Sequence, residues 1–483
     1  MKRILLTCAV VTLLALVATG CVRILQHDSS YTPALAGDGQ GSAVVVFAES
    51  GKGGLTDFVA QKVGPTGERQ WGGNGVLLGS GYRSLPSFRD LTVVDDSHGE
   101  ALVGWKAQAS ESGPLVGHVA KLASGGTLLW QRELAAFDQL VADGIGGAIL
   151  IYDHAIAANV TGPDESRFAV VRLDAQGEYA WGESGVDVSR ANYWPNSLRV
   201  SHDGRGGAIA LWEESRSVSA PTVSRFKTES RIVAQRIDAA GGLPWGPQGI
   251  LVSENAEGVR IEEPALATDG NGGVIVAWQR VPQGPVTSGT PEALRLDILV
   301  QKLDANGRIL WQPDGVPLDI SRSAENAGPH TPVLVSDGAL GAIAVWEDLR
   351  NGLASIYAQR VDDSGSPMWQ TGGVKACYVP SPASLAFRQV TGDGRGGAVV
   401  SAAFTGGVLV QKLDAGGNAT WGDNGVVVTS MSTTSHLSST DGQGGAIVAW
   451  GAGNSSYVQR IGADGRLAGW EGNGIRLDRL IDA

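Results

Sequence analysis

The stretch DGNGGVIVAW at residues 269–278 decides the architecture of this chain, because close versions of it recur along the sequence. It begins with an Asp-Gly turn, continues as a short apolar segment and ends in an aromatic residue. The turn aspartate recurs as Asp38, Asp96, Asp143, Asp203, Asp269, Asp337, Asp393 and Asp441. Nine residues later stand Phe47, Trp105, Tyr152, Trp212, Trp278, Trp346, Ala402 and Trp450. A fixed internal repeat of this kind indicates a repeat architecture.

A second tryptophan column completes every copy of the repeat. Its members are Trp71, Trp130, Trp181, Trp245, Trp311, Trp369, Trp421 and Trp470. A glycine precedes the tryptophan by four residues in seven copies and by five at Gly465. The segments within each copy are short, β-branched and bounded by Gly, Asp and Asn, which is typical of strands. Four such segments in each copy predict a four-stranded antiparallel sheet.

Eight four-stranded units predict an all-β protein, an eight-bladed β-propeller spanning residues 31–483, with a seven-bladed propeller as the alternative. A solenoid would need coils of nearly constant length. Here the interval from the first aromatic column to the following glycine varies from Trp450–Gly465 to Trp278–Gly307. We therefore expect blades around one axis, with the second tryptophan column between neighbouring blades and closure by a complete or nearly complete blade.

The first twenty residues have a cationic start, an apolar stretch and small residues before Cys21. This pattern is typical of a secretory signal peptide over residues 1–20. The sequence Ala18-Thr19-Gly20-Cys21 resembles the bacterial lipobox, which implies lipid attachment at Cys21 and a linker over residues 21–30. Simple cleavage or a retained anchor are the alternatives. We expect an exported lipoprotein on the extracytoplasmic or outer surface of the bacterial envelope, attached to membrane only through its lipid.

Charge and cysteine content narrow the classes of partner. The formal net charge is −12 and no basic stripe is present, which disfavours nucleic acid as a partner.

Cys377 is the single cysteine beyond Cys21, and we interpret it as a buried small apolar residue. No metal-ligand cluster and no HExxH, GxSxG, CxxC or P-loop signature occurs, so we expect no metal and no cofactor. We expect a monomer.

The segments KLDANGRILW (302–311) and KLDAGGNATW (412–421) resemble the repeats of pyrroloquinoline-quinone-type propellers. The resemblance implies that the tryptophan packs between blades. The family includes quinone dehydrogenases and outer-membrane lipoproteins that bind partners. The enzymes' cofactor site does not carry over, because the chain lacks vicinal cysteines and a metal-ligand cluster. The segment WEDLRNG (346–352), followed by IYAQRVD (356–362), is more similar to exported bacterial surface repeats of unassigned activity.

One position in the third segment of every copy is basic, namely Lys62, Lys121, Arg172, Arg236, Lys302, Arg360, Lys412 and Arg460. Because blades pack on both faces, we expect these side chains to form structural ion pairs with carboxylates, with an anion-binding ring as the alternative. We expect each turn aspartate to bond its own backbone. Calcium binding is the alternative, but each turn supplies only one carboxylate.

We name the four strands of a blade a, b, c and d in chain order. The connections of variable length are the b–c and d–a loops, which all lie on one face of the predicted propeller. Loops on a rigid scaffold carry binding residues. Trp194 is the only tryptophan outside the two columns, with simple packing as the alternative role. The candidate binding residues on this face are Tyr193, Trp194, Glu213, Glu214, Arg216, Arg225, His330, Glu347, Asp348 and Arg350.

These observations predict a binding or scaffold module at the bacterial cell envelope, with an envelope protein or glycan as its partner. Aromatic and arginine side chains in adjacent loops are typical of both kinds of site. The alternative is a surface polysaccharide hydrolase or lyase that uses carboxylates on the same face. A purely structural envelope component is a third possibility. We assign no catalytic residue.

Overall fold

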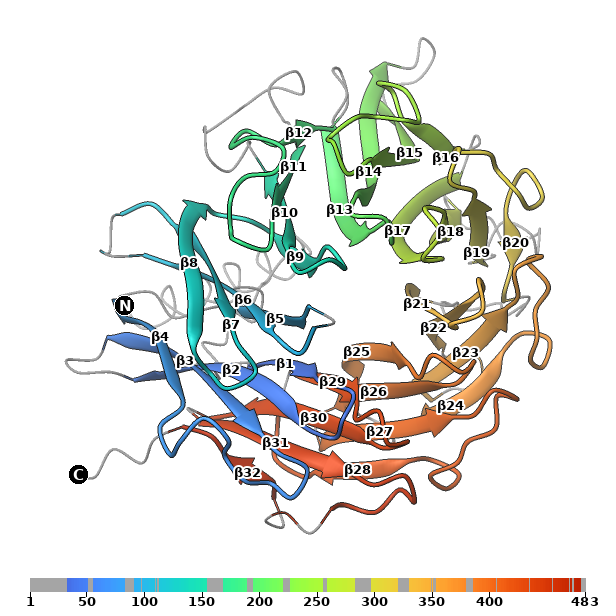
Figure 1. The fold of residues 1–483 in the computed structure, drawn as a ribbon. Helices are drawn as coiled ribbons and strands as arrows, with labels where there is room; N and C mark the ends of the chain where they lie inside the picture. Colours follow the sequence, from blue (N-terminus) through green and yellow to red (C-terminus); the bar gives the residue numbers. More distant parts are fainter. Residues whose placement is uncertain are drawn as a thin grey trace, which may run out of the picture.

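The computed structural model describes residues 33–50, 55–82, 91–96, 98–108, 110, 113–153, 168–188, 194–219, 226–254, 259–282, 297–319, 330–348, 350, 353–378, 385–404, 406–433, 435–453, 455–468, 470 and 473–478. Within these residues, thirty-two strands form eight four-stranded sheets and no helix is present. The sheets surround one axis, as Figure 1 shows. The predicted all-β, eight-bladed propeller is confirmed. Over the same residues no helix is long and apolar enough to span a membrane.

The first four blades follow the chain in order. Blade 1 contains β1 (Ala34–Gly37), β2 (Ala43–Ser50), β3 (Thr56–Val63) and β4 (Val76–Tyr82). Blade 2 contains β5 (Leu91–Asp95), β6 (Ala101–Ala107), β7 (Val116–Leu122) and β8 (Leu128–Ala135). Blade 3 contains β9 (Gln139–Ala142), β10 (Ala148–Asp153), β11 (Phe168–Leu173) and β12 (Val186–Asp187). Blade 4 contains β13 (Trp194–His202), β14 (Ala208–Ser219), β15 (Phe226–Ile237) and β16 (Ile250–Glu254).

The other four blades repeat this order. Blade 5 contains β17 (Val259–Thr268), β18 (Val274–Pro282), β19 (Asp297–Leu303) and β20 (Val316–Pro317). Blade 6 contains β21 (His330–Ser336), β22 (Ala342–Asp348), β23 (Ser355–Val361) and β24 (Val374–Tyr378). Blade 7 contains β25 (Leu385–Gly392), β26 (Ala398–Phe404), β27 (Gly407–Leu413) and β28 (Val426–Thr429). Blade 8 contains β29 (His436–Thr440), β30 (Ala446–Ala452), β31 (Ser455–Ile461) and β32 (Ile475–Arg476).

Every blade is built from one continuous stretch of chain, with its four strands antiparallel and adjacent in sequence order. The first strand lies nearest the axis and the fourth at the rim (Figure 1). The ring therefore closes with a complete blade, as predicted. Side chains make the closure: Arg460 of blade 8 donates to the carbonyl of Pro65 in blade 1 at 3.0 Å, and Arg69 of blade 1 donates to the carbonyl of Arg476 at 2.8 Å.

The core is divided among the seams between blades. The second and third strands of each blade are buried on both faces, which explains their continuous apolar character. The residue nine positions after each turn aspartate lies in the second strand and is buried in all eight blades. This includes Ala402, which replaces the aromatic residue in blade 7. Cys377 is completely buried, and burial raises the pKa of its thiol to about 12. This thiol is a packing group, as predicted, because only the thiolate is a nucleophile.

The second tryptophan column joins each blade to the next one. Each indole ring packs against the glycine four or five residues before the tryptophan of the following blade, and Trp470 packs against Gly67 across the closure. A Cβ atom on these glycines would lie 2.7 to 3.1 Å from the indole ring. The glycines also have φ between 78° and 92°. Any larger residue would be strained and would push the ring away. This one contact therefore explains why the second tryptophan and the glycine before it recur together in the sequence.

The turn aspartates close their own hairpins. In all eight blades, Oδ1 accepts hydrogen bonds from the backbone N–H groups two and four residues later; for Asp203 these belong to Arg205 and Gly207, at 2.8 and 2.8 Å. The predicted role of these aspartates in their own turns is confirmed.

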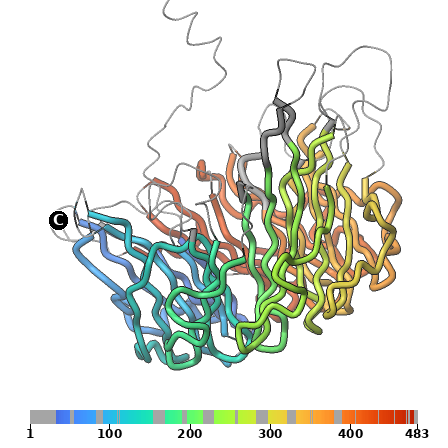
Figure 2. The backbone as a smooth tube through the Cα atoms, turned by 90° about the horizontal axis from the view of Figure 1, so that it is seen from above, coloured from blue at the N-terminus to red at the C-terminus, as the bar shows by residue number. Residues whose placement is uncertain are grey.

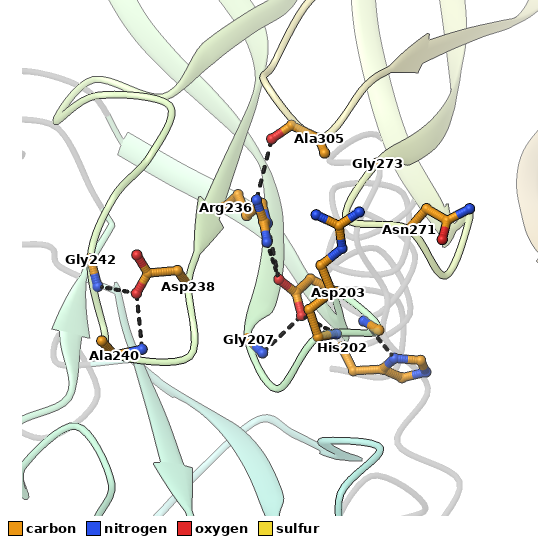
Figure 3. Close-up of polar contacts among 12 residues, drawn as sticks. His202, Asp203, Gly207, Arg236, Asp238, Ala240, Gly242, Asn271, Gly273 and Ala305 are labelled. Atoms are coloured by element: carbon orange, nitrogen blue, oxygen red, sulfur yellow. Dashed lines mark hydrogen bonds and ion pairs between the residues drawn. The ribbon is translucent and has the colours of Figure 1, made fainter.

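The other carboxylate oxygen, Oδ2, pairs with the basic side chain of the third strand. Seven of the eight basic side chains reach Oδ2 of the turn aspartate in their own blade, at 2.8 to 3.8 Å. Figure 3 shows the pair formed by Arg236 and Asp203, whose N–O distance is 2.8 Å. The same arginine donates to the carbonyl of Ala305 in blade 5 at 3.3 Å. We call this arrangement of turn aspartate, strand-c cation and carbonyl of the next blade the seam clasp.

We predict that Arg236→Met lowers the free energy of unfolding by about 3–5 kcal/mol, because it leaves the fully buried carboxylate of Asp203 without its counter-ion. Urea unfolding followed by tryptophan fluorescence measures the change. Adding Asp203→Asn to this variant should restore part of the loss. The control is Arg466→Met, whose side chain is 88% exposed and whose replacement should cost less than about 0.5 kcal/mol. Equal losses in the two single variants would contradict the clasp.

A buried polar network spans the seam between blades 7 and 8. The His436 imidazole is 1% exposed, and its Nε2 lies 2.8 Å from the Ser401 hydroxyl. That hydroxyl lies 2.8 Å from the Ser438 hydroxyl, and the Ser438 backbone N–H donates to the side-chain oxygen of Gln389 at 2.6 Å. Burial lowers the pKa of His436 to about 3. The imidazole is therefore neutral in the folded protein at every pH above that value.

We predict an acid-sensitive contribution to stability from His436. Below the ordinary pKa of 6.5 the imidazole binds a proton in the unfolded chain, whereas the folded protein excludes the proton until about pH 3. Stability is therefore lost as the pH falls through this window. Thermal unfolding between pH 7 and 4 should show a weaker pH dependence in His436→Gln than in the wild type. A wild-type pH dependence in His436→Gln would contradict the role assigned to His436.

Candidate functional site

Several predicted binding residues lie outside the described part of the structure. Tyr193 and Arg225 are not described, and only the backbone is described for Trp194, Arg216 and His330. Their backbones pair with those of Ser215, Glu229 and Glu347 respectively. The predicted contacts of their side chains with a ligand remain predictions.

Blade 4 carries the longest hairpin strands of the described structure, because β14 and β15 each contain twelve residues. These strands continue toward the face of the b–c and d–a loops, the upper face in Figure 2. Successive side chains of a strand point to opposite faces. Ile209 and Leu211 of β14 pack toward blade 5, whereas Ala210 and Trp212 pack toward blade 3.

Because side chains alternate between the two faces of β14, Glu213 and Glu214, which follow Trp212, point to opposite faces. Glu213 continues the row that faces blade 5, and Glu214 continues the row that faces blade 3. The Glu214 side chain is 1% exposed and accepts a hydrogen bond from Trp212 Nε1 at 3.2 Å. The two neighbouring carboxylates therefore do not form one pair. The partners of Glu213 come from the adjacent blade instead.

Three innermost strands carry the same irregularity beside this position. Residues Ser197, Glu263 and Thr331 have φ of 52°, 55° and 41°, in the left-handed region that non-glycine residues rarely adopt. Each lies at a register shift of the first strand, in blades 4, 5 and 6. Such bulges re-aim side chains, and each left-handed residue costs about 1–3 kcal/mol. The three bulges face the same end of the wheel, on the side of Glu213.

The bulge of β17 brings a cluster of charges to Glu213. Burial and the neighbouring carboxylates of Glu262 and Glu263 raise the pKa of Glu213 to about 7, against a smaller opposing effect of Arg260. Arg260 itself pairs with Glu262 at 2.7 Å. Three carboxyl groups and one guanidinium thus interact electrostatically around Glu213 at the seam of blades 4 and 5. We call Glu213, Arg260, Glu262 and Glu263 the acidic cluster.

The predicted residues of blade 6 form a different kind of cluster. Arg350 donates from Nε to Asp348 at 2.7 Å, from a second nitrogen to Asp319 at 2.9 Å and from a third to the carbonyl of Gly372 at 2.9 Å. Its guanidinium also lies 4.0 Å from the ring centre of Tyr357. Asp319 and Asp348 are both fully buried. These contacts give Asp348 and Arg350 a structural role at the seam of blades 5 and 6.

The chemistry available at the acidic cluster follows from its charges. Ionised carboxylates accept hydrogen bonds and bind cations, and a carboxyl group with a pKa near 7 exchanges a proton at physiological pH. In the described residues no group of three His, Cys, Asp or Glu side chains has the geometry to hold a metal ion. In the sequence Glu262 and Glu263 stand only as two adjacent acidic residues, and no motif distinguishes Arg260 or Asp319.

The comparisons with known proteins show similarity of fold alone. No family model and no curated protein matches the sequence. An ulvan lyase of polysaccharide lyase family 25 has a TM-score of 0.45 at 11% identity, covering 81% of this chain and 95% of that one. The polysaccharide lyase Uly1 has a TM-score of 0.45 at 9% identity, covering 81% and 91%. The β-propeller domain of the trilobed protease from Pyrococcus furiosus has a TM-score of 0.39 at 8% identity, covering 94% and 99%.

Proposed function

We propose that this protein is an exported, lipid-anchored binding module of the bacterial cell envelope, which holds an envelope protein or glycan on the loop face of blades 4 to 6. The acidic cluster is the observation that carries the proposal. It places carboxyl groups from two blades at one seam, beside the longest hairpin of the described structure. The signal-peptide pattern of residues 1–20 supports the proposed export, and the lipobox-like sequence ending at Cys21 supports the proposed lipid anchor.

The charge of the site indicates which groups of a partner it would contact. With one guanidinium among three carboxyl groups, the acidic cluster favours ligands that present hydrogen-bond donors or positive charge. Hydroxyl groups of a glycan and basic side chains of a protein both satisfy this condition. The bulged inner strands hold the cluster on a rigid sheet, which reduces the ordering cost of binding. The net charge of −12 argues against nucleic acid.

We predict that Trp194→Ala and Glu213→Gln each weaken binding to the partner, and that the loss for Trp194→Ala is about 2 kcal/mol or more. Binding of the purified protein to arrayed bacterial envelope glycans and to solubilised envelope proteins gives the measurement. Both variants should keep a melting temperature within a few degrees of the wild type. Arg466→Ala, on the opposite face, is the control. Unfolding of Trp194→Ala, or a partner cross-linked to the Asp-Gly turns, would contradict the assignment.

The alternative function is cleavage of a polysaccharide at the same site. One observation favours it: the carboxyl group of Glu213, with its pKa raised to about 7, is suited to act as a general acid or base. An assay with uronic-acid polysaccharides would distinguish the two functions. Unsaturated products absorbing in the ultraviolet would indicate a lyase, and new reducing ends without that absorbance a hydrolase. Activity that survives in Glu213→Gln would exclude this residue as the acid or base.

A further inference from the structure

The ion pair of the seam clasp is absent at one place among the described residues. Lys412 of β27 is the one member of the basic column with no carboxylate oxygen within 4.0 Å in the described residues. Its Nζ donates to the carbonyl of Gly444 in blade 8 at 2.7 Å. Five other members of the basic column also donate to a carbonyl of the next blade, namely Lys121, Arg172, Arg236, Lys302 and Arg460. The aspartate of its own turn, Asp393, uses Oδ1 for the backbone N–H groups of Arg395 and Gly397, at 2.8 and 2.8 Å.

The equivalent lysine of blade 5 has an additional carboxylate partner that Lys412 lacks. Lys302 donates to the carbonyl of Leu340 at 2.8 Å and forms an ion pair with Asp363 of blade 6. Trp311 Nε1 donates to the carbonyl of Asp363 at 3.0 Å, and Trp421 Nε1 donates in the same way to Ala463 at 3.1 Å. Ala463 therefore occupies the position of Asp363. The seam of blades 7 and 8 has a methyl group where the seam of blades 5 and 6 has a carboxylate.

A cavity of about 90 Å³ occupies this seam, on the face of the Asp-Gly turns. Its lining includes Lys412, Arg395, Asp393, Thr440 and the backbone of residues 444–445. A single water needs only about 10–15 Å³ by the same measure, so the cavity accommodates a larger polar guest. Two cationic side chains and one carboxylate give the lining a net positive formal charge. The cavity lies on the opposite face from the acidic cluster.

We propose that this cavity binds a protonated oxyanion, namely hydrogen phosphate or the singly ionised form of a phosphate monoester. Two of its oxygens accept hydrogen bonds from Lys412 Nζ and from the Arg395 guanidinium, because both groups only donate. An ionised carboxylate only accepts, so Asp393 would repel an anion without a proton. Hydrogen phosphate carries a P–OH group that can donate to Asp393, whereas sulfate carries none. The lining therefore selects phosphate over sulfate, and this site is independent of the proposed function of the loop face.

We predict saturable binding of inorganic phosphate to the purified protein by isothermal titration calorimetry in a phosphate-free buffer of low ionic strength. Sulfate should bind about tenfold more weakly or worse, because each charged hydrogen bond contributes roughly 1.5–3 kcal/mol. Lys412→Met, which keeps the apolar stem, should weaken phosphate binding by about tenfold or more for the same reason. The matched control is Lys302→Met, in the seam that has its own carboxylate, and it should bind phosphate like the wild type.

Two further variants keep the test decisive if Lys412→Met unfolds. Ala463→Asp places a carboxylate where Asp363 lies in blade 6, and it should abolish phosphate binding while maintaining or raising the melting temperature. Asp393→Asn, whose amide can donate to an anion, should bring sulfate affinity up to that of phosphate. The proposal is overturned if phosphate does not bind, if Lys302→Met weakens phosphate binding as much as Lys412→Met, or if the wild type binds sulfate as well as phosphate.

Discussion

The carboxylate of the turn aspartate is the group on which the rest of the wheel depends. One oxygen closes the hairpin between the first two strands, and the other binds a cation from the third strand. That cation continues to a carbonyl of the next blade. Hairpin, sheet and seam thus share one buried charge pair. Removing a single partner of such a pair leaves an uncompensated charge, which explains why aspartate and cation recur together in the seven blades where they pair.

The architecture could be predicted because its determinants are local in sequence. The Asp-Gly turn, the nine-residue spacing and the tryptophan column each fall within one hairpin, and each predicts a strand boundary. The two halves of the clasp lie farther apart: Asp203 and Arg236 are in different strands of one blade. The sequence indicated a carboxylate partner for the basic column without showing which one. The pairing becomes visible only once the register of the sheet brings the two columns together.

The candidate site was less predictable for a physical reason. Adjacent acidic residues in a strand point to opposite faces, so Glu213 and Glu214 belong to different seams. The carboxyl groups that raise the pKa of Glu213 come from the next blade, and they arrive there through a bulge in β17. A left-handed glutamate at position 263 has no signature in the sequence, because the repeat predicts only regular strands. Contacts across blades require the three-dimensional register.

The deviations from the repeat carry more functional information than the repeat itself. Where the turn aspartate pairs with the strand-c cation, their polar atoms are occupied by one another, and little capacity is left for a ligand. The repeat is interrupted in two ways: the first strands of blades 4 to 6 carry bulges, and Lys412 forms no ion pair with a described carboxylate. They lie on opposite faces of the wheel and involve opposite charges. A rigid ring whose seams are closed by internal ion pairs can therefore present two chemically distinct surfaces, because each arises where one seam departs from the pattern that closes the others.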